Sequence, residues 1–402
     1  MTSLNILIVG GGIAGPMAAY WLAKAGHRVT IIERAPTLLK TGQGIDIEGP
    51  AREIIDRMGV LDQMKAKSTQ EEGFAFTDNN GVPVATIRGG LTQEIEIMRG
   101  EMCEILCKAA DAFESVHFRY ETNIVDIVQM PDRVEVLLSN DQKESYDAVI
   151  GADGMRSKTR ELAFDEGTKA KAFRARDHYC AYFSIPHEDG DGPHSRWQNA
   201  TRGRSILIRP HTDEISSVYL AQRDKSDSLS AACRSDKESQ KLAVAAAFEG
   251  VGGLGPRVVK GMLESDNFYF DSLSQIILDK WSQERVALIG DAAYAPSAVT
   301  GQGVILSVLG AYIIAGELSE TPENPIAAFK RYESRIRKYV DKQQAIPFGG
   351  NAPRVANPRT NWGIWILRMT FRFIAWSGIW KWISFKGPSF PLPEYPRMNY
   401  RD

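Results

Sequence analysis

Three short stretches of this chain place glycines and an acidic residue where a strand is expected to end. They are residues 6–15 (Ile-Leu-Ile-Val-Gly-Gly-Gly-Ile-Ala-Gly), residues 151–160 (Gly-Ala-Asp-Gly-Met-Arg-Ser-Lys-Thr-Arg), and Gly290-Asp291 followed by Gly301-Gln302-Gly303. Glycine lets the backbone turn sharply and approach a pyrophosphate closely, and a carboxylate accepts hydrogen bonds from ribose hydroxyls. Together the three stretches suit the binding of one large phosphorylated cofactor.

The first stretch has the surroundings that a dinucleotide site requires. Gly10, Gly12 and Gly15 match the pattern G-x-G-x-x-G directly after an apolar run that indicates a buried strand. Apolar residues at helical spacing predict that a helix follows, and its N-terminal amides would face the phosphates. A second apolar run, residues 28–32, ends at Glu33, where an acid is expected to bind ribose hydroxyls. A glycine-rich turn of an ordinary α/β protein is the alternative, and it does not require this combination.

Length, charge and cysteine usage limit the possible classes of protein. The chain has 402 residues, more than one hydrophobic core usually supports, so we expect two domains. Its 48 lysines and arginines balance 50 aspartates and glutamates, so nucleic acid is not an expected partner. Cys103, Cys107, Cys180 and Cys233 have no metal-binding spacing, and we expect buried free thiols and no metal site. The N-terminus lacks the cationic region of a secretory signal, which predicts a cytoplasmic, reducing location.

Hydrophobic periodicity predicts an α/β domain that is interrupted by a separate sheet. Helices are expected at residues 51–64, 95–110, 239–248 and 304–318, and strands near 115–140, at 147–151 and at 285–289. The region from about 170 to 222 is β-rich, with strands expected at 181–185, 205–208 and 217–220. We therefore predict a Rossmann-like domain made of residues 1–75, 95–168 and 272–345, and a second domain made of residues 76–94 and 169–271. The glycines of residues 251–255 follow a helix-like run, so we reject a second dinucleotide site there.

The remaining residues, 346–402, contain a segment rich in tryptophan. Residues 362–385 hold five of the eight tryptophans of the chain. Arg368, Arg372 and Lys381 interrupt the apolar run, so a helix that spans a membrane is not expected. A helix lying on a membrane surface is an open alternative, because aromatic and basic residues together favour the headgroup region. We favour a long C-terminal helix that packs across both domains.

Taken together, these motifs resemble the single-component (class A) FAD-dependent monooxygenases related to para-hydroxybenzoate hydroxylase, and most of all the branch of tetracycline-inactivating monooxygenases. The resemblance covers residues 4–345, and its most specific part is the family motif Asp-Gly-x-x-Ser-x-x-Arg, which Asp153, Gly154, Ser157 and Arg160 match. In that family the first glycines bind the ADP half of FAD, and the Gly-Asp motif holds a ribityl or ribose hydroxyl. The resemblance implies an FAD-binding domain with an inserted substrate domain.

The resemblance also implies individual contacts with FAD. Carried onto this chain, they are Gly10, Gly12, Ile13, Ala14, Gly15, Glu33, Arg34, Gly44, Arg99, Asp153, Gly154, Gly290, Asp291, Gly301 and Gly303. The helix expected after Gly301 would offer amides and a positive dipole end to the charge of a reduced flavin. The alternatives are a helix-capping role for Asp291 and a surface ion pair for Arg99.

The sequence departs from the family pattern on the expected reactive side of the flavin. Family members commonly carry His after Gly-Asp-Ala-Ala and Pro four residues later, whereas this chain has Tyr294 and Ala298. The departures leave the type of substrate open, and Tyr294 is the candidate general base. The candidate substrate contacts are Asp46, which lies in a segment resembling the tetracycline-inactivating branch, Gln198 and Arg209, and Trp197 and Arg204 are further residues that could face the pocket.

The resemblance implies an enzyme that takes a hydride from NADPH or NADH onto FAD. It would then use O2 to hydroxylate or epoxidise a small organic substrate through a C4a-hydroperoxyflavin. We expect a monomer or weak dimer with a role in secondary metabolism, and aromatic, polyketide and alkaloid substrates are all open. Two alternatives are another FAD oxidoreductase, such as an oxidase or a reductase, and a flavin-binding protein without enzymatic activity.

Overall fold

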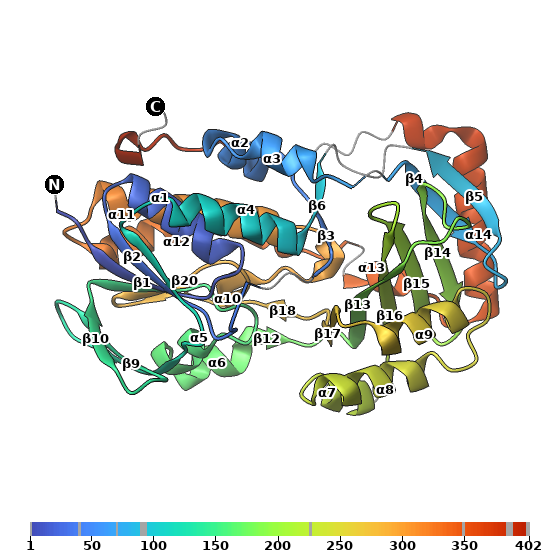
Figure 1. Ribbon diagram of the computed structural model, residues 1–402, viewed down its shortest axis with the longest axis horizontal. Coiled ribbons are helices and arrows are strands. Elements are labelled where there is room, and N and C mark those ends of the chain that lie inside the picture. Colours follow the sequence, from blue (N-terminus) through green and yellow to red (C-terminus); the bar gives the residue numbers. More distant parts are fainter. Residues whose placement is uncertain are drawn as a thin grey trace.

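A computed structural model describes residues 2–38, 42–69, 71–88, 95–224, 227–347, 350–382 and 389–398. Two large sheets dominate the molecule and occupy its two ends (Figure 1). The chain crosses between them several times, as the interrupted α/β pattern predicts. The fold is thus of the α/β class, with a Rossmann-like domain and an inserted β-sheet domain.

The first sheet has six strands in the order β19-β20-β11-β1-β2-β7 and is parallel except for the β19–β20 pair. Its strands are β1 (Asn5–Val9), β2 (Arg28–Ile32), β7 (Val116–Arg119), β11 (Ala148–Gly151), β19 (Ser282–Gln283) and β20 (Val286–Leu288). The central strands are almost entirely buried because helices cover a parallel sheet on both faces, which explains their continuous apolar runs. The strands predicted from those runs are confirmed.

Helices surround this sheet and build the larger of the hydrophobic cores. They are α1 (Ala14–Lys24), α2 (Gly49–Arg57), α3 (Leu61–Ala66), α4 (Arg99–Asp111), α5 (Lys158–Ala163), α6 (Glu166–Ala172), α10 (Asp291–Tyr294), α11 (Gly303–Glu320) and α12 (Pro325–Gln344). Helix α11 is long and apolar enough to cross a membrane, but 89% of it is buried inside the protein, as in a core helix. A three-stranded antiparallel sheet, β8 (Ile124–Gln129), β9 (Val134–Leu138) and β10 (Lys143–Tyr146), lies at the same end of the molecule.

Two of the predicted helices differ in detail from the observed ones. The helix expected at residues 51–64 is broken into α2 and α3, because Gly59 adopts a left-handed φ of 76° between them. The helix expected at residues 95–110 begins only at Arg99, since β6 (Glu96–Met98) pairs with β3 (Gly44–Asp46). Met98 therefore belongs to a strand and not to the helix face.

The second sheet has seven strands in the order β17-β13-β16-β15-β14-β4-β5. They are β4 (Gly73–Thr77), β5 (Pro83–Arg88), β13 (His178–Pro186), β14 (His194–Ala200), β15 (Arg204–Pro210), β16 (Ile215–Arg223) and β17 (Phe268–Ser272). All neighbouring strands are antiparallel except β14 and β4. The predicted domain boundaries at 75/76 and 271/272 fall inside β4 and β17. A boundary that keeps each strand whole lies a few residues away, and the division into domains stays a prediction. A short pair, β12 (Phe173–Arg174) and β18 (Gln275–Ile276), connects the two ends.

The pleat gives the seven-stranded sheet two different faces. Residues such as Ala181, Phe183 and Leu220 point to a helix face, which α7 (Asp227–Ala232), α8 (Lys237–Ala247) and α9 (Gly255–Glu264) cover. Residues of the opposite parity, including Tyr182 and Tyr219, form what we call the tyrosine face. Side chains on these two faces cannot meet, which decides below which residues reach the substrate.

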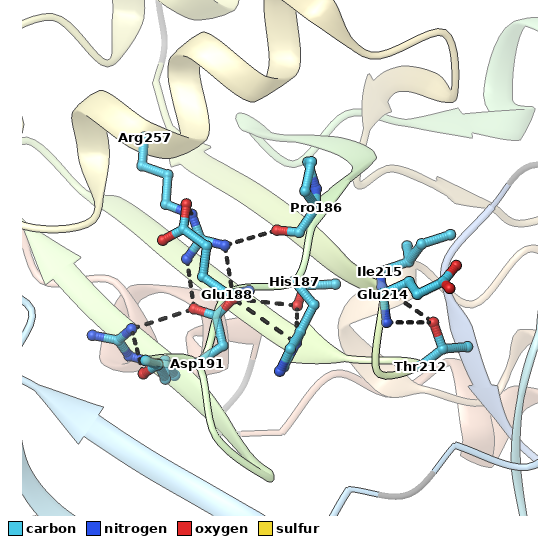
Figure 2. A network of polar contacts seen from close by, with 11 residues as sticks. Pro186, His187, Glu188, Asp191, Thr212, Glu214, Ile215 and Arg257 are labelled. Atoms are coloured by element: carbon cyan, nitrogen blue, oxygen red, sulfur yellow. Dashed lines mark hydrogen bonds and ion pairs between the residues drawn. The ribbon is translucent and has the colours of Figure 1, made fainter.

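Buried polar contacts fasten the helices to the second sheet (Figure 2). Asp191, 4% exposed, lies in the β13–β14 connection and accepts two hydrogen bonds from Arg257 of α9, at 2.5 and 2.7 Å. Arg257 also donates to the carbonyl of Pro186 at the end of β13. Because the guanidinium serves both segments, it holds α9 against the rim of the sheet.

The C-terminal residues contact both ends of the molecule, but through different parts. Helix α14 (Asn361–Ser377), which follows the short α13 (Ala352–Ala356), packs mainly on β5 and β14, and its Phe371 stacks on Phe76 of the neighbouring β4 with ring centroids 3.6 Å apart. Beyond it come the 3-10 turns at Ile379–Trp382 and Pro396–Met398, and Tyr395 and Met398 are buried in the core of the first domain. The prediction that the helix itself crosses both domains is therefore wrong: the tail returns to the first domain and α14 does not.

Candidate active site

A cavity of about 320 Å³ lies between the two ends of the molecule, where helices of the first domain meet the seven-stranded sheet. Its walls come from the β3 segment, the start of α4, the tyrosine face and the loop between α10 and α11. The residues that carry functional groups into it are Gln43, Asp46, Arg99, Tyr182, Arg209, Tyr219, Tyr269, Asp271, Asp291 and Ser297. Segments from all parts of the chain thus meet at one place.

The glycines of the first motif differ in what requires them. A Cβ on Gly10, whose φ is 113°, would lie 2.5 Å from the carbonyl oxygen of Ala152, and a Cβ on Gly15 would lie 2.0 Å from the carbonyl oxygen of Gly10. These two glycines are required by the packing of the protein on itself. A Cβ on Gly12 would meet no atom within 4 Å, so this position opens onto free space at the start of α1. Gly12 is the glycine whose missing side chain leaves room for a ligand.

Glu33 lies at the end of β2, beside the same loop. Its Oε2 accepts a hydrogen bond from the N–H of Gly11 at 2.8 Å and its Oε1 accepts one from Ala35 at 2.9 Å. The carboxylate is therefore held in a fixed orientation next to the glycine turn. Ile13 and Ala14 are buried at the start of α1, whereas Arg34 is exposed, and their contacts with a cofactor stay predictions.

The second motif stabilises its own turn. Asp153 accepts hydrogen bonds from the hydroxyl of Ser157 at 2.6 Å and from the N–H of Thr159 at 2.9 Å, and Ser157 caps α5 by accepting from the N–H of Arg160. Arg160, 9% exposed, donates to the carbonyl of Ala292 at 2.7 Å. Because Ala292 belongs to α10, this arginine ties the second motif to the third. The side chains of Asp153, Ser157 and Arg160 thus make hydrogen bonds within the protein, and Asp153 and Gly154 would contact a cofactor through their backbone.

The third motif brings a free carboxylate into the cavity. Asp291 begins α10, and its side chain has no hydrogen bond to a residue that the structure describes. Burial raises the pKa of Asp291, and Arg99, which also lines the cavity, opposes that shift. A buried carboxylate beside an arginine suits a ligand that donates hydroxyl groups. Neither the helix-capping role nor the surface ion pair, the alternatives from the sequence, describes these two residues.

The N-terminus of α11 points amides at the same space. Gly303 and Val304 line the cavity, and α11 is 18 residues long, so its dipole favours negative charge there. The Oε1 atoms of Gln43 and Gln302 are buried without a hydrogen-bond partner in the described structure. Orphaned buried oxygens cost free energy unless a ligand donates to them.

A row of three tyrosines forms the opposite wall. Tyr269 on β17, Tyr182 on β13 and Tyr219 on β16 are register neighbours, with ring centroids 6.2 Å and 5.0 Å apart along the row. Sequence reasoning missed all three, because they become neighbours only through strand pairing. Alternation along β13 and β16 was visible, and it could have indicated that tyrosines share one face.

Arg209 reaches the cavity from β15 and is held by two buried carboxylates. It donates to Glu71 at 2.9 Å and to Glu96 at 2.6 Å. Burial raises the pKa of Glu96 to about 7, against the effect of Arg209, and Asp46 and Glu71 add to the rise. The nearby Tyr219 hydroxyl accepts a hydrogen bond from the N–H of Gly44 at 2.8 Å. The prediction that Asp46, Arg209 and Gly44 lie at the site agrees with this arrangement, although their contacts with ligands are untested.

Tyr294 does not face the cavity. Its hydroxyl accepts a hydrogen bond from Tyr332 at 2.9 Å, its ring packs on Trp281, and it is 1% exposed. Burial raises its pKa to about 12. Its place as candidate general base is therefore wrong, because the side chain fills the core between α10, α11 and α12.

Three further residues of the β-rich region that were predicted to face the pocket do not line the cavity. Gln198 lies on the helix face, where it bonds to the carbonyl of Gly252 and the N–H of Leu254. Arg204 donates to carbonyls at the end of α8, and Trp197 lies beneath α14. The prediction of Gln198 as a substrate contact is wrong, since strand pleating turns it away from the cavity.

The residues present fit an FAD molecule. Gly12 leaves free space at a helix N-terminus for phosphates, Asp291 and Arg99 offer polar groups without a side-chain hydrogen bond among the described residues, and α11 supplies a positive dipole end. Within the described part of the chain, no group of three or more His, Cys, Asp or Glu residues is placed to hold a metal ion.

Comparisons with known proteins agree with this fit. Residues 3–342 match the model of the FAD binding domain family. The monooxygenase CTB7 of Cercospora beticola is 40% identical over 98% of this chain and 99% of its own length. The FAD-dependent monooxygenase asL4 of Sarocladium schorii is 31% identical over 99% of both chains. The crystal structure of the tetracycline destructase Tet(51) superposes with a TM-score of 0.80, at 28% identity, over 98% of this chain and 100% of that one.

The chain belongs to the FAD-dependent monooxygenases. It is a class A enzyme of the para-hydroxybenzoate hydroxylase superfamily, which uses FAD, NAD(P)H and O2 to oxygenate a small organic substrate. This monooxygenase therefore meets its substrate beside the flavin, and the alternatives without oxygenase activity are set aside.

Proposed function

We propose that this monooxygenase hydroxylates a planar, phenolic aromatic compound in the cavity beneath the tyrosine face. The observation that carries the proposal is the row formed by Tyr269, Tyr182 and Tyr219, which lines the same cavity as Asp291 and the start of α11. Aromatic rings in such a wall bind flat aromatic ligands through stacked or edge contacts. The likeness to a tetracycline destructase supports an aromatic polycyclic substrate.

Different residues of the chain would bind FAD and the substrate. Gly12 and the N-terminus of α1 would bind the pyrophosphate, and Asp291 would accept hydrogen bonds from a ribityl or ribose hydroxyl. Bound there, FAD supplies the redox and oxygen chemistry of the reaction. The protein would position the acceptor and exclude water, and Tyr219 and Arg209, which line the cavity, would bind a phenolic oxygen of the substrate.

The proposal is tested by screening NADPH consumption with phenolic and saturated compounds under labelled O2. A tetracycline and an anthraquinone represent planar phenols, and cyclohexanol is the saturated control. We expect the phenols to accelerate NADPH oxidation and to carry the label in the product. Acceleration by cyclohexanol alone, with no labelled phenol, would refute the aromatic assignment.

A pair of matched variants tests the wall itself. Tyr219→Phe removes a hydroxyl that lines the cavity, whereas Tyr179→Phe removes one from the helix face of the same sheet. We expect the first to raise the KM of a phenolic substrate about tenfold, through loss of a hydrogen bond worth about 1 kcal/mol or more. The second is expected to leave the KM unchanged.

The proposal also covers the location of the enzyme in the cell and its oligomeric state. All four cysteines are buried free thiols, as predicted, which supports work in a reducing compartment such as the cytoplasm. The monomeric or weakly dimeric state stays a prediction, and sedimentation of the purified protein tests it.

A further inference from the structure

A second cavity, outside the flavin site, is lined by four arginines. It measures about 250 Å³, and its walls include Arg176, Arg223, Arg354 and Arg359, with Asp177 as the one carboxylate. Arg223, Arg354 and Arg359 make no ion pair within the described part of the chain. Burial, and then the charges of Arg359 and Arg354, lower the pKa of Arg223. Such an excess of positive charge attracts an anion.

A buried histidine also marks this place as a binding site. His178 is 6% exposed, and its Nε2 has no hydrogen-bond partner, while its Nδ1 is 2.5 Å from the carbonyl oxygen of Arg176. Because Nδ1 donates to that carbonyl and burial lowers the pKa of His178, its Nε2 is an acceptor, and the partner that it lacks in this cavity is a donor such as a ligand hydroxyl. One ring nitrogen of His178 thus has a hydrogen-bond partner in the protein, and the other has none at the arginine cavity.

A third cavity, about 150 Å³, shares lining residues with both the arginine cavity and the flavin site. Arg176, His178 and Arg354 line it together with Leu273 and Ser297. Leu273 and Ser297 also line the flavin and substrate cavity. A ligand long enough to fill the arginine cavity can therefore reach the wall of the flavin site.

We propose that the arginine cavity binds the phosphate groups of NADPH, with the nicotinamide directed along the third cavity toward the flavin. Arginine is the residue that accommodates the 2′-phosphate of NADP, through paired N–H donors. This inference rests on the proposed hydroxylation, which needs a reductant, and the described part of the chain holds only one dinucleotide-binding fold. It adds Arg223, Arg354, Arg359 and His178 as binding residues of the enzyme.

The test measures binding and flavin reduction in the purified holoenzyme. Binding of 2′,5′-ADP is followed by calorimetry, and reduction by NADPH is followed anaerobically as loss of yellow absorbance, with and without a phenolic compound. Arg223→Gln and Arg354→Gln are expected to weaken both 2′,5′-ADP and NADPH about tenfold or more each. FAD content and the limiting reduction rate at saturating NADPH are expected to stay at the wild-type value.

Arg133→Gln is the control, because Arg133 lies on the exposed β8–β9 hairpin. Unchanged dissociation constants in the Arg223 and Arg354 variants would overturn the proposal. Inorganic phosphate that binds wild type but not the variants, with NADPH saturation unaltered, would show a free-anion site and also overturn it. Failure of NADPH to reduce the wild-type flavin, with 2′,5′-ADP still bound at the arginines, would contradict the proposed function instead.

The exposed face of α14 carries a second, independent inference. Trp362, Trp365, Phe373 and Trp376 are between 56% and 83% exposed and form one stripe along the helix, opposite the residues that pack on β5 and β14. Helix α14 itself carries two arginines, Arg368 and Arg372, and no aspartate or glutamate, in a chain whose net charge is −2. Exposed tryptophans on a helix with positive charge match the headgroup region of an anionic bilayer.

We infer that α14 docks the enzyme on an anionic membrane surface. Vesicles of phosphatidylcholine, alone or mixed with phosphatidylglycerol, are floated with the full chain. We expect at least about tenfold more bound protein on the mixed vesicles, and loss of that binding in a Trp365→Ser, Trp376→Ser double variant. Leu242→Ser, which removes a 65% exposed side chain from α8, is the control and should float like wild type. Absence of flotation, or a dimer in solution that the double variant dissociates, would overturn the inference.

Discussion

Replacing Gly12 by valine should weaken FAD binding strongly while leaving the fold intact. The position has no atom within 4 Å of an added Cβ and no left-handed φ, so the side chain fits the protein. We expect the free energy of unfolding of the apoprotein to change by less than about 1 kcal/mol. The same side chain would occupy the space beside the N-terminus of α1 that the pyrophosphate needs.

The loss of affinity can be estimated from the hydrogen bonds involved. A hydrogen bond to a charged group contributes about 1.5–3 kcal/mol, and displacing the pyrophosphate breaks at least two. The dissociation constant of FAD should therefore rise about 10²- to 10⁴-fold. The assay is the ratio of flavin to protein absorbance after purification, with flavin fluorescence titration of the apoprotein for the dissociation constant.

Gly15→Ala is the informative comparison. Its Cβ would lie 2.0 Å from the carbonyl oxygen of Gly10, so the backbone must move and the apoprotein should lose about 3 kcal/mol or more. A yellow Gly12→Val protein with full FAD content would refute the assignment of this loop to the pyrophosphate. If the Gly12→Val apoprotein were as unstable as the Gly15→Ala apoprotein, the claim that Gly12 is free of packing constraints would be refuted.

The remaining predictions concern three side chains. Asp291→Asn should give a folded protein with at least about tenfold weaker FAD binding, measured by fluorescence titration, because an acceptor for flavin hydroxyls is lost; unchanged affinity would contradict the role. Between pH 4.5 and pH 7 the wild type should lose about 3 kcal/mol of stability that Glu96→Gln does not lose, because the folded pKa of about 7 exceeds the ordinary 4.5 and the ionised form is disfavoured on folding. Urea unfolding across this range checks the slope, and a variant whose stability falls as steeply as that of the wild type would contradict it. Tyr294→Phe should cost about 1 kcal/mol through its bond to Tyr332 and leave the pH profile of kcat unchanged; a lost basic limb would restore Tyr294 as the base.

Local sequence determined the cofactor-binding half of this protein. The first glycine turn, the strands around it and the Asp153–Arg160 motif were predicted, because each is a short segment whose conformation depends on its own residues. Buried parallel strands are apolar throughout, so periodicity alone locates them. The motifs also fixed the family, since glycine turns and terminal acids are what a dinucleotide requires of its neighbours.

Tertiary structure alone decided which side chains reach the substrate. In β14, Trp197 and Gln198 point to opposite faces, and neither reaches the cavity because α14 covers one and α9 borders the other. Tyr182, Tyr219 and Tyr269 become a wall only through the pairing of β13 with β16 and β17. Tyr294 stands in the third motif, yet packing on Trp281 turns it into the core. The direction of a strand residue depends on its register and on what covers each face of the sheet, and both are set by contacts between residues far apart in the chain.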